Sequence, residues 1–249
     1  MGPPEVTGDS ARPAFYAARP GRLRDWWTLL HPPYTAWHLS YVVIGACLAP
    51  SVALSRLLAA LAAFFLAVGL AAHAYDELQD RPLRTAIPSW ALVTATVSGL
   101  AGALVLGSFG VLTVGTVLVP FLVVGPLLVV AYNGDLFGGA FHTDLVFALS
   151  WGAFPVLTAY VAQAGDLSWS AALGAAGATA LSLAQRFLST PARQLRRRVV
   201  DVHGSAVLAD GSQTHLDRDG LLAPLERALR AIAWAVVLLA AALAVLRLA

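Results

Sequence analysis

Long apolar runs separated by short polar segments dominate the pattern of the chain. A run of about 18 or more apolar residues crosses a bilayer as a helix, because a helix hydrogen-bonds its own backbone groups. The pattern therefore predicts an all-α fold, a polytopic membrane helix bundle of about seven transmembrane helices. The predicted spans are Tyr34–Leu54, Leu57–Tyr75, Trp90–Leu106, Val111–Val130, Leu145–Ala162, Trp169–Leu188 and Ala231–Ala249.

The polar segments complete the expected organisation. Residues 1–33 form an N-terminal segment, in which Arg22–Leu30 is expected to be a short helix lying on the membrane surface. Residues 34–249 form one transmembrane domain with a cytoplasmic loop at 189–228, whose Gly/Asp/Ser-rich part at 201–219 is expected to be mobile. Charged residues make up 12% of the chain, about half the usual share of soluble domains, so a soluble helical core is excluded.

The distribution of arginine predicts the orientation. The chain has no lysine, and 14 of its 16 arginines lie on one side if the N-terminus is inside; only Arg56 and Arg247 fall outside. Because cytoplasmic loops carry an excess of positive charge, we expect a multi-pass cell-membrane protein with a cytoplasmic N-terminus and a cytoplasmic active face. The single Cys47 excludes an intrachain disulfide.

One polar cluster stands at the end of the second span. His73, Asp76, Glu77 and Asp80 have the spacing i, i+3, i+4 and i+7, which places them on one helical face, and Pro82 predicts that the helix ends near Asp80. Carboxylates suit Mg²⁺, so Asp76, Asp80 and Glu77 are candidate metal ligands. The alternative is a solvated helix end whose acids are balanced by arginines.

Arg81 and Arg84 follow this cluster directly. Arginine binds phosphate through two hydrogen bonds at once, so carboxylates beside arginines suggest a metal bridge and a cationic clamp for a diphosphate. His73 lies one turn inside the apolar span, where a polar residue is costly unless it is used or paired. This favours the site over the solvated helix end.

The cluster resembles the first aspartate-rich motif of the UbiA-type intramembrane prenyltransferase superfamily, Asn-Asp-x-x-Asp-x-x-x-Asp. Here Asp76 and Asp80 match the end of the motif, whereas Ala72-His73 replaces its leading Asn-Asp. A second likeness follows the fourth span, at Tyr132-Asn133-Gly134-Asp135 and Asp144. The resemblance covers about Leu29 to Leu188.

The resemblance implies a Mg²⁺-dependent membrane enzyme that acts on an isoprenoid diphosphate, most simply by prenyl transfer to a small or lipidic acceptor. Its partners would be membrane lipid and the isoprenoid diphosphate, with no nucleic acid. The implied catalytic residues are Asp76, Asp80 and His73. The implied substrate-binding residues are Arg81, Arg84, Tyr132, Asn133, Asp135, Asp144, Arg186 and Arg193.

The chain departs from the family at the second aspartate-rich motif. The corresponding segment, Gln185–Arg198, contains no carboxylate, so one Mg²⁺ ion is expected rather than two, and Arg186 and Arg193 are expected to bind the diphosphate directly. Arg196–Arg198 is interpreted as a lipid-attracted triplet, and His31 and His38 as interfacial packing residues. The alternatives are a UbiA-type terpene cyclase, a non-catalytic lipid-binding or scaffold relative, and a transporter.

Overall fold

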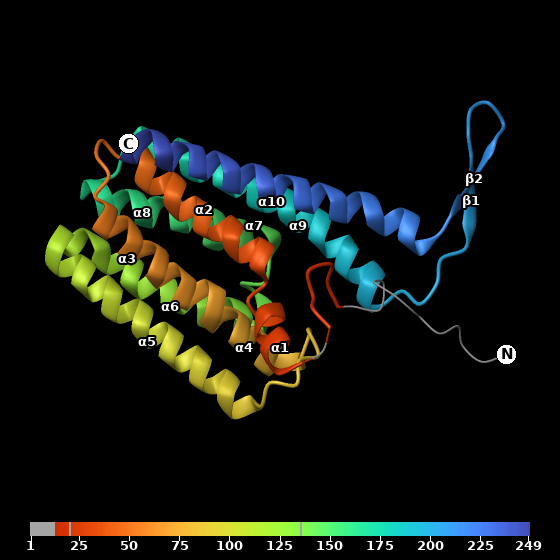
Figure 1. Ribbon diagram of the computed structural model, residues 1–249, viewed down its shortest axis with the longest axis horizontal. Helices are drawn as coiled ribbons and strands as arrows, with labels where there is room; N and C mark the ends of the chain where they lie inside the picture. Colours follow the sequence, from red (N-terminus) through yellow and green to blue (C-terminus); the bar gives the residue numbers. More distant parts are fainter. Residues whose placement is uncertain (1–12, 20, 135) are drawn as a thin grey trace.

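The computed structural model describes residues 13–19, 21–134 and 136–249, which form a bundle of long helices lying side by side (Figure 1). The α-helices are α1 (Arg22–Leu29), α2 (Pro32–Leu48), α3 (Leu54–Phe64), α4 (His73–Asp80), α5 (Ser89–Val114), α6 (Val119–Asn133), α7 (Asp144–Ala148), α8 (Phe154–Ala164), α9 (Trp169–Arg197) and α10 (Arg218–Leu248). Short 3-10 turns are η3 (Thr116–Leu118) and η4 (Leu136–Gly139), and π-helical segments are η2 (Phe65–Ala72) and η5 (Leu149–Ala153).

Five of the helices in the described ranges are long and apolar enough to cross a membrane. They are Leu54–Asp80, Ser89–Val114, Thr116–Asn133, Asp144–Ala164 and Arg218–Leu248. Large apolar side chains point outward, as on α5, where Trp90, Phe109 and Leu112 are exposed. The fold is therefore a mainly helical bundle with the character of a membrane protein. The two remaining predicted spans form α2 and α9.

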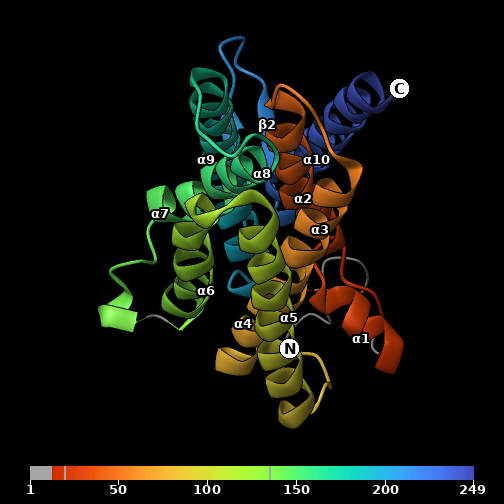
Figure 2. The same cartoon turned by 90° about the vertical axis from the view of Figure 1, so that its left-hand side faces the viewer.

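Helix α2 lies at the centre of the bundle. Its side chains Trp37, Tyr41 and Val42 are fully buried, and in Figure 2 α2 and α8 lie between α5 and α6 on one side and α9 and α10 on the other. At Gly45 an added Cβ would come within 2.2 Å of the Val156 carbonyl oxygen of α8. Only glycine permits so close a contact between helix backbones.

Two of the long helices change their winding beside the polar end of the bundle. The π-helical segment η2 directly precedes His73, and η5 interrupts the helix between α7 and α8. A π-helical turn holds more residues than an α-helical turn. Side chains after such a segment are therefore rotated away from the face that regular α-helical spacing predicts.

Several predicted boundaries are wrong. Helix α5 continues through residues 107–110, where an outer loop was expected, and ends at Val114, just before Gly115, whose φ of 127° suits glycine. Helix α9 continues through Pro191 to Arg197. The expected cytoplasmic loop therefore begins after Arg197 and ends where α10 starts at Arg218. Helix α1 confirms the expected short N-terminal helix.

The segment at 201–219 is not the irregular loop that its composition predicts. It contains an antiparallel hairpin of β1 (Gly204–Val207) and β2 (Gln213–Leu216), which projects beyond the polar end of the bundle (Figure 1). Its turn is closed by the Leu208 amide donating to the Ser212 carbonyl at 2.8 Å. Within the described residues, the pairing of these two short strands is the exception to the predicted all-α fold.

Candidate functional site

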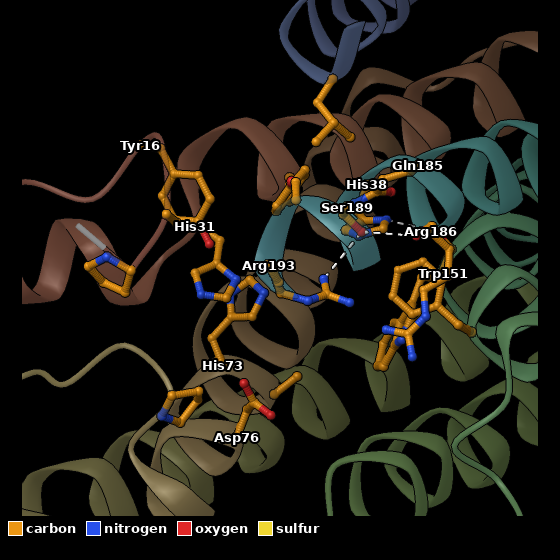
Figure 3. A pocket seen from close by; sticks show the side chains of 18 of the residues that line it. Tyr16, His31, His38, His73, Asp76, Trp151, Gln185, Arg186, Ser189 and Arg193 are labelled. Atoms are coloured by element: carbon orange, nitrogen blue, oxygen red, sulfur yellow. Dashed lines mark hydrogen bonds between the residues drawn. The ribbon is translucent and has the colours of Figure 1, made fainter. Parts of the chain in front are cut away.

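A cavity of about 280 Å³ opens at the polar end of the bundle. Its walls come from α2, η2, α4, the end of α6, α7, η5, α9 and α10, and the segment at 13–16 lines part of it. Figure 3 shows side chains from these separate elements converging on one space. Segments far apart in the sequence therefore build one site.

Four histidines line the cavity, namely His31, His38, His73 and His142. The rings of His31 and His73 lie against each other with centroids 4.1 Å apart. Nδ1 of His73 lies 3.1 Å from the Gly69 carbonyl oxygen, and Nδ1 of His38 lies 2.9 Å from the Trp151 carbonyl oxygen. Because a carbonyl only accepts, Nδ1 carries the hydrogen in both rings, and Nε2 is an acceptor when the ring is neutral.

His31 is held in an unusual state. Its backbone is left-handed, with a φ of 47°, and its ring is buried between His73 and Tyr16. Burial lowers the pKa of His31 well below its ordinary value of 6.5, and the charges of His73, Arg197 and Arg193 lower it further. The imidazole is therefore neutral at physiological pH.

Four arginines of α9 reach the cavity, and two of them are paired with carboxylates. Arg196 forms a bidentate ion pair with Glu226 of α10, in which the guanidinium NH2 group donates to Oε2 at 2.8 Å. Nε of Arg186 donates to Asp144 at the start of α7 at 2.8 Å. These two pairs fix the cavity walls formed by α9 against α10 and α7.

The other two arginines have no carboxylate partner among the residues that the structure describes. Arg193 donates to the hydroxyl oxygens of Ser189 and Thr190, each at 3.2 Å, and reaches into the middle of the cavity (Figure 3). Arg197 donates from Nε to the Pro13 carbonyl oxygen at 3.2 Å. The cavity thus carries two positive charges that no described carboxylate neutralises by an ion pair.

Buried polar atoms without a partner gather in this cavity. Within the described ranges, Nε2 of His31, the hydroxyl of Tyr132 and Oε1 of Gln185 are buried and lack a hydrogen bond. All three residues line the cavity. An unsatisfied buried polar atom costs about 1–3 kcal/mol, so their concentration here marks a site that a polar ligand would complete.

An apolar groove adjoins the polar cavity. It has a volume of about 100 Å³ and lies between η2, α5, α6 and η5, with almost entirely apolar walls. Val68 and Trp151 line both spaces, so the two share a wall. Phe64, Leu122 and Phe154 line the groove farther along. The combined shape suits a molecule with an anionic head and an apolar tail.

The structure places only part of the predicted site at the cavity. Six of the predicted residues line it, namely His73, Asp76, Tyr132, Asn133, Arg186 and Arg193. Asp144 lies behind Arg186 as its ion-pair partner. Asp135 lies outside the described residues. Glu77, Asp80, Arg81 and Arg84 do not line the cavity.

Glu77 supports a loop instead of facing the cavity. Its carboxylate is fully buried and accepts hydrogen bonds from the amides of Leu83 and Thr85, both at 2.9 Å, and from the Thr85 hydroxyl. Asp80 is exposed at the end of α4, a full turn beyond Asp76. The predicted common face therefore brings only His73 and Asp76 to the site, and no group of three or more metal-ligating side chains occurs in the described ranges.

The two arginines after α4 do not reach the cavity either, because one binds within the loop and the other faces solvent. Arg81 donates to the Ile87 carbonyl oxygen at 2.6 Å and to the Ser89 hydroxyl at 2.7 Å, which closes the loop. Arg84 is exposed. The cationic groups at the cavity therefore come from α9 rather than from this loop.

Sequence reasoning missed several residues of the site. The lipid-attracted interpretation is wrong for Arg196, whose side chain is only 5% exposed, and for Arg197, which lines the cavity. It fits Arg198, which is exposed. His31 and His38, expected to pack at the interface, line the cavity. His38 lies on α2, whereas His31 is the left-handed residue just before that helix, so regular helical spacing does not relate the two.

The N-terminal segment forms part of the wall. Pro13, Phe15 and Tyr16 line the cavity, and Tyr16 packs edge-on against Tyr34 with ring centroids 5.6 Å apart. The guanidinium of Arg230 lies 4.9 Å from the ring centre of Phe15. Burial raises the pKa of the Tyr16 hydroxyl, which therefore stays protonated.

No protein-family model, curated protein or solved structure matches this chain significantly.

Proposed function

We propose that this protein is a membrane-embedded enzyme that acts on an isoprenoid diphosphate and transfers its prenyl group to a small or lipidic acceptor. One observation carries the proposal: a cavity with two arginines that no described carboxylate pairs with shares the walls Val68 and Trp151 with an apolar groove between helices. An isoprenoid diphosphate has the matching chemistry, with several negative charges at one end and a branched apolar chain at the other. The resemblance of the His73–Asp80 region to prenyltransferases points to the same substrate class.

The arginines would bind the diphosphate and stabilise it as a leaving group. Arg193 and Arg197 lie on one helix, and their guanidinium groups keep their charge at any relevant pH. Donors held in place before the reaction stabilise charge as it develops, because they need no reorganisation at that moment. Tyr132 adds a buried hydroxyl without a partner within the described ranges.

Asp76 fits a single Mg²⁺ ion. It lines the cavity and forms no hydrogen bond or ion pair with the described residues. Mg²⁺ is usually held by one or two protein carboxylates together with substrate phosphates, so one carboxylate beside a diphosphate suffices. When bound, the ion would offset the charge that develops on the leaving group.

The proposal includes the orientation of the protein. We propose that α2 and α9 also cross the bilayer, which gives seven spans, with the N-terminus and the cavity on the cytoplasmic side of the cell membrane. Helix α2 has 17 residues, at the lower end of the length that spans a bilayer. The asymmetry of 14 arginines against 2 supports this orientation.

Binding and turnover in lipid nanodiscs test the proposal. Arg193→Ala removes a cavity cation, whereas Arg198→Ala removes an exposed one from the end of the same helix. A hydrogen bond to a charged group contributes about 1.5–3 kcal/mol, so Arg193→Ala should weaken binding of a radiolabelled prenyl diphosphate roughly 10- to 100-fold. Arg198→Ala should leave it within about twofold, and Arg193→Lys should restore it only in part.

Three outcomes of this experiment differ in meaning. Release of diphosphate by the wild-type protein, lost in Arg193→Ala, supports the enzyme. Tight binding without consumption of the prenyl diphosphate, alone or with any acceptor tried, supports a non-catalytic relative. Equal effects of Arg193→Ala and Arg198→Ala would remove the cavity from consideration as the diphosphate site.

A further inference from the structure

The paired imidazoles of His31 and His73 are the part of the cavity that diphosphate binding does not explain. A diphosphate is held by cations and hydrogen-bond donors, whereas a neutral imidazole offers an acceptor lone pair. His73 has its Nδ1 hydrogen directed at the Gly69 carbonyl, so its lone pair is on Nε2. Nε2 of His31 is buried and has no hydrogen-bond partner among the described residues.

The two rings together can take up one additional proton but not two. Ring centroids 4.1 Å apart leave no room for two imidazolium charges in a buried space, because each cation disfavours the other. His31 is left-handed and fixed between the rings of Tyr16 and His73. That backbone conformation is uncommon for a residue other than glycine, and it places the His31 ring against His73.

We propose that His73, with His31 as its partner, is the base that accepts the proton released when the prenyl group joins its acceptor. The inference rests on the proposed prenyl transfer. The bond between C1 of the prenyl chain and the diphosphate oxygen breaks, and its electron pair leaves with the diphosphate. An electron pair of the acceptor forms the new bond to C1. The proton on the attacking atom moves to Nε2 of His73, while the electron pair of its former bond stays on the acceptor.

The charged groups around the histidine pair make its basicity depend on whether the diphosphate is bound. Those facing it are Tyr16 from the N-terminal segment, Tyr34 and His38 from α2, Asp76 from α4, and Arg193 and Arg197 from α9. The two arginines disfavour a charged imidazole while the cavity holds no anion. A bound diphosphate offsets their charge, so the pair becomes a stronger base when the substrate is in place.

Substitution of the two histidines tests this role. His73→Gln keeps a donor for the Gly69 carbonyl but has no basic nitrogen, and His31→Asn keeps a residue that tolerates the left-handed backbone. His215→Gln, on the exposed hairpin, is the control. Because a positioned base contributes about 10²- to 10⁴-fold, His73→Gln should lower the rate of prenyl transfer by that factor and leave the affinity for inorganic diphosphate within twofold. His31→Asn should change the acidic limb of the pH profile of kcat/KM.

The readouts separate this inference from the proposed function. Loss of prenyl transfer with retained diphosphate affinity supports the base, and a wild-type rate in His73→Gln overturns it while the enzyme assignment stands. If the wild-type protein turns over no prenyl diphosphate, the proposed function falls and the catalytic role falls with it. Nitrogen NMR of ¹⁵N-histidine-labelled protein with inorganic diphosphate then decides whether the pair is a proton acceptor at all. One proton shared by the two rings supports the pair, and two independent titrations near pH 6.5 overturn it.

Discussion

The ion pair between Arg196 and Glu226 allows a quantitative test of how the cavity is held open. It joins α9 to α10, and the two side chains are only 5% and 8% exposed. Glu226→Ala would remove the carboxylate that pairs with the buried Arg196 guanidinium, in a cavity that three other arginines also line. Breaking a buried pair in this way costs about 3–5 kcal/mol.

The same helix carries a matched control. Arg186 forms a comparable pair with Asp144, but the Asp144 side chain is 51% exposed, so water replaces the lost contact. Exposed pairs contribute about 0.2–1 kcal/mol. For a chain of this size, 1 kcal/mol corresponds to about 2–4 °C in Tm. Glu226→Ala should therefore lower Tm by about 6–20 °C, and Asp144→Ala by about 4 °C or less.

Thermal unfolding of the two variants in the same nanodiscs measures the difference. A further variant, Arg196→Met combined with Glu226→Leu, removes both charges and should recover most of the lost stability, since apolar replacements of buried pairs are often neutral. Equal Tm shifts in Glu226→Ala and Asp144→Ala would contradict the argument. So would a double variant as unstable as Glu226→Ala, because the cost would then not arise from the lost charge pairing between Arg196 and Glu226.

Two further predictions concern stability. Because the pKa of His31 is lowered in the folded protein, the unfolded chain binds a proton there more readily than the folded one. The free energy of unfolding should therefore fall as pH drops below 6.5, by up to about 1.4 kcal/mol per pH unit. Denaturant titrations at pH 5 and 7 should show a smaller loss of this free energy for His31→Asn than for the wild-type protein. Gly45→Ala should destabilise by about 1–3 kcal/mol because its Cβ would overlap the Val156 carbonyl, whereas Gly177→Ala, with nothing within 4 Å of its Cβ, should be neutral or slightly stabilising in the same thermal assay.

The apolar pattern predicted the helices well because desolvation of the backbone in lipid leaves few alternatives to a helix. It failed at residues 107–110, where a short outer loop was expected between two spans. Gly107 lies within α5, and a Cβ there would come within 2.8 Å of Leu122 on α6. The glycine therefore serves helix packing. A glycine in the sequence does not by itself show whether the position lies in a loop or in a tight contact between two helices.

The polar cluster after the second span was predicted only in part, and the reasons are local. Regular spacing placed His73, Asp76, Glu77 and Asp80 on one helical face, but only His73 and Asp76 of that face line the cavity. The loop after α4 needs hydrogen-bond acceptors, and Glu77 supplies them to Leu83 and Thr85. No helical periodicity shows that a loop will use a carboxylate.

The rest of the site depends on contacts between distant segments. Arg196 lies in a run of three arginines, and a run of that kind favours attraction to lipid until a buried carboxylate, Glu226, is known to lie beside it. The approach of residues 13–16 to the cavity has no signal in the local pattern either. Such contacts join residues that are 30 or more positions apart.

In the proposed enzyme, the absence of carboxylates from Gln185–Arg198 and the arginines of the cavity form one electrostatic arrangement. A second metal held by carboxylates would bring a net positive charge to the diphosphate. In the proposed enzyme, Arg193 and Arg197 bring positive charge to the same place without a carboxylate cage. Asp76 is the one carboxylate lining the cavity that has no ion pair with a described residue. Further carboxylates in the cavity would therefore repel the diphosphate instead of binding it through a metal ion. The arginines of this segment are therefore consistent with binding of a diphosphate in the proposed enzyme.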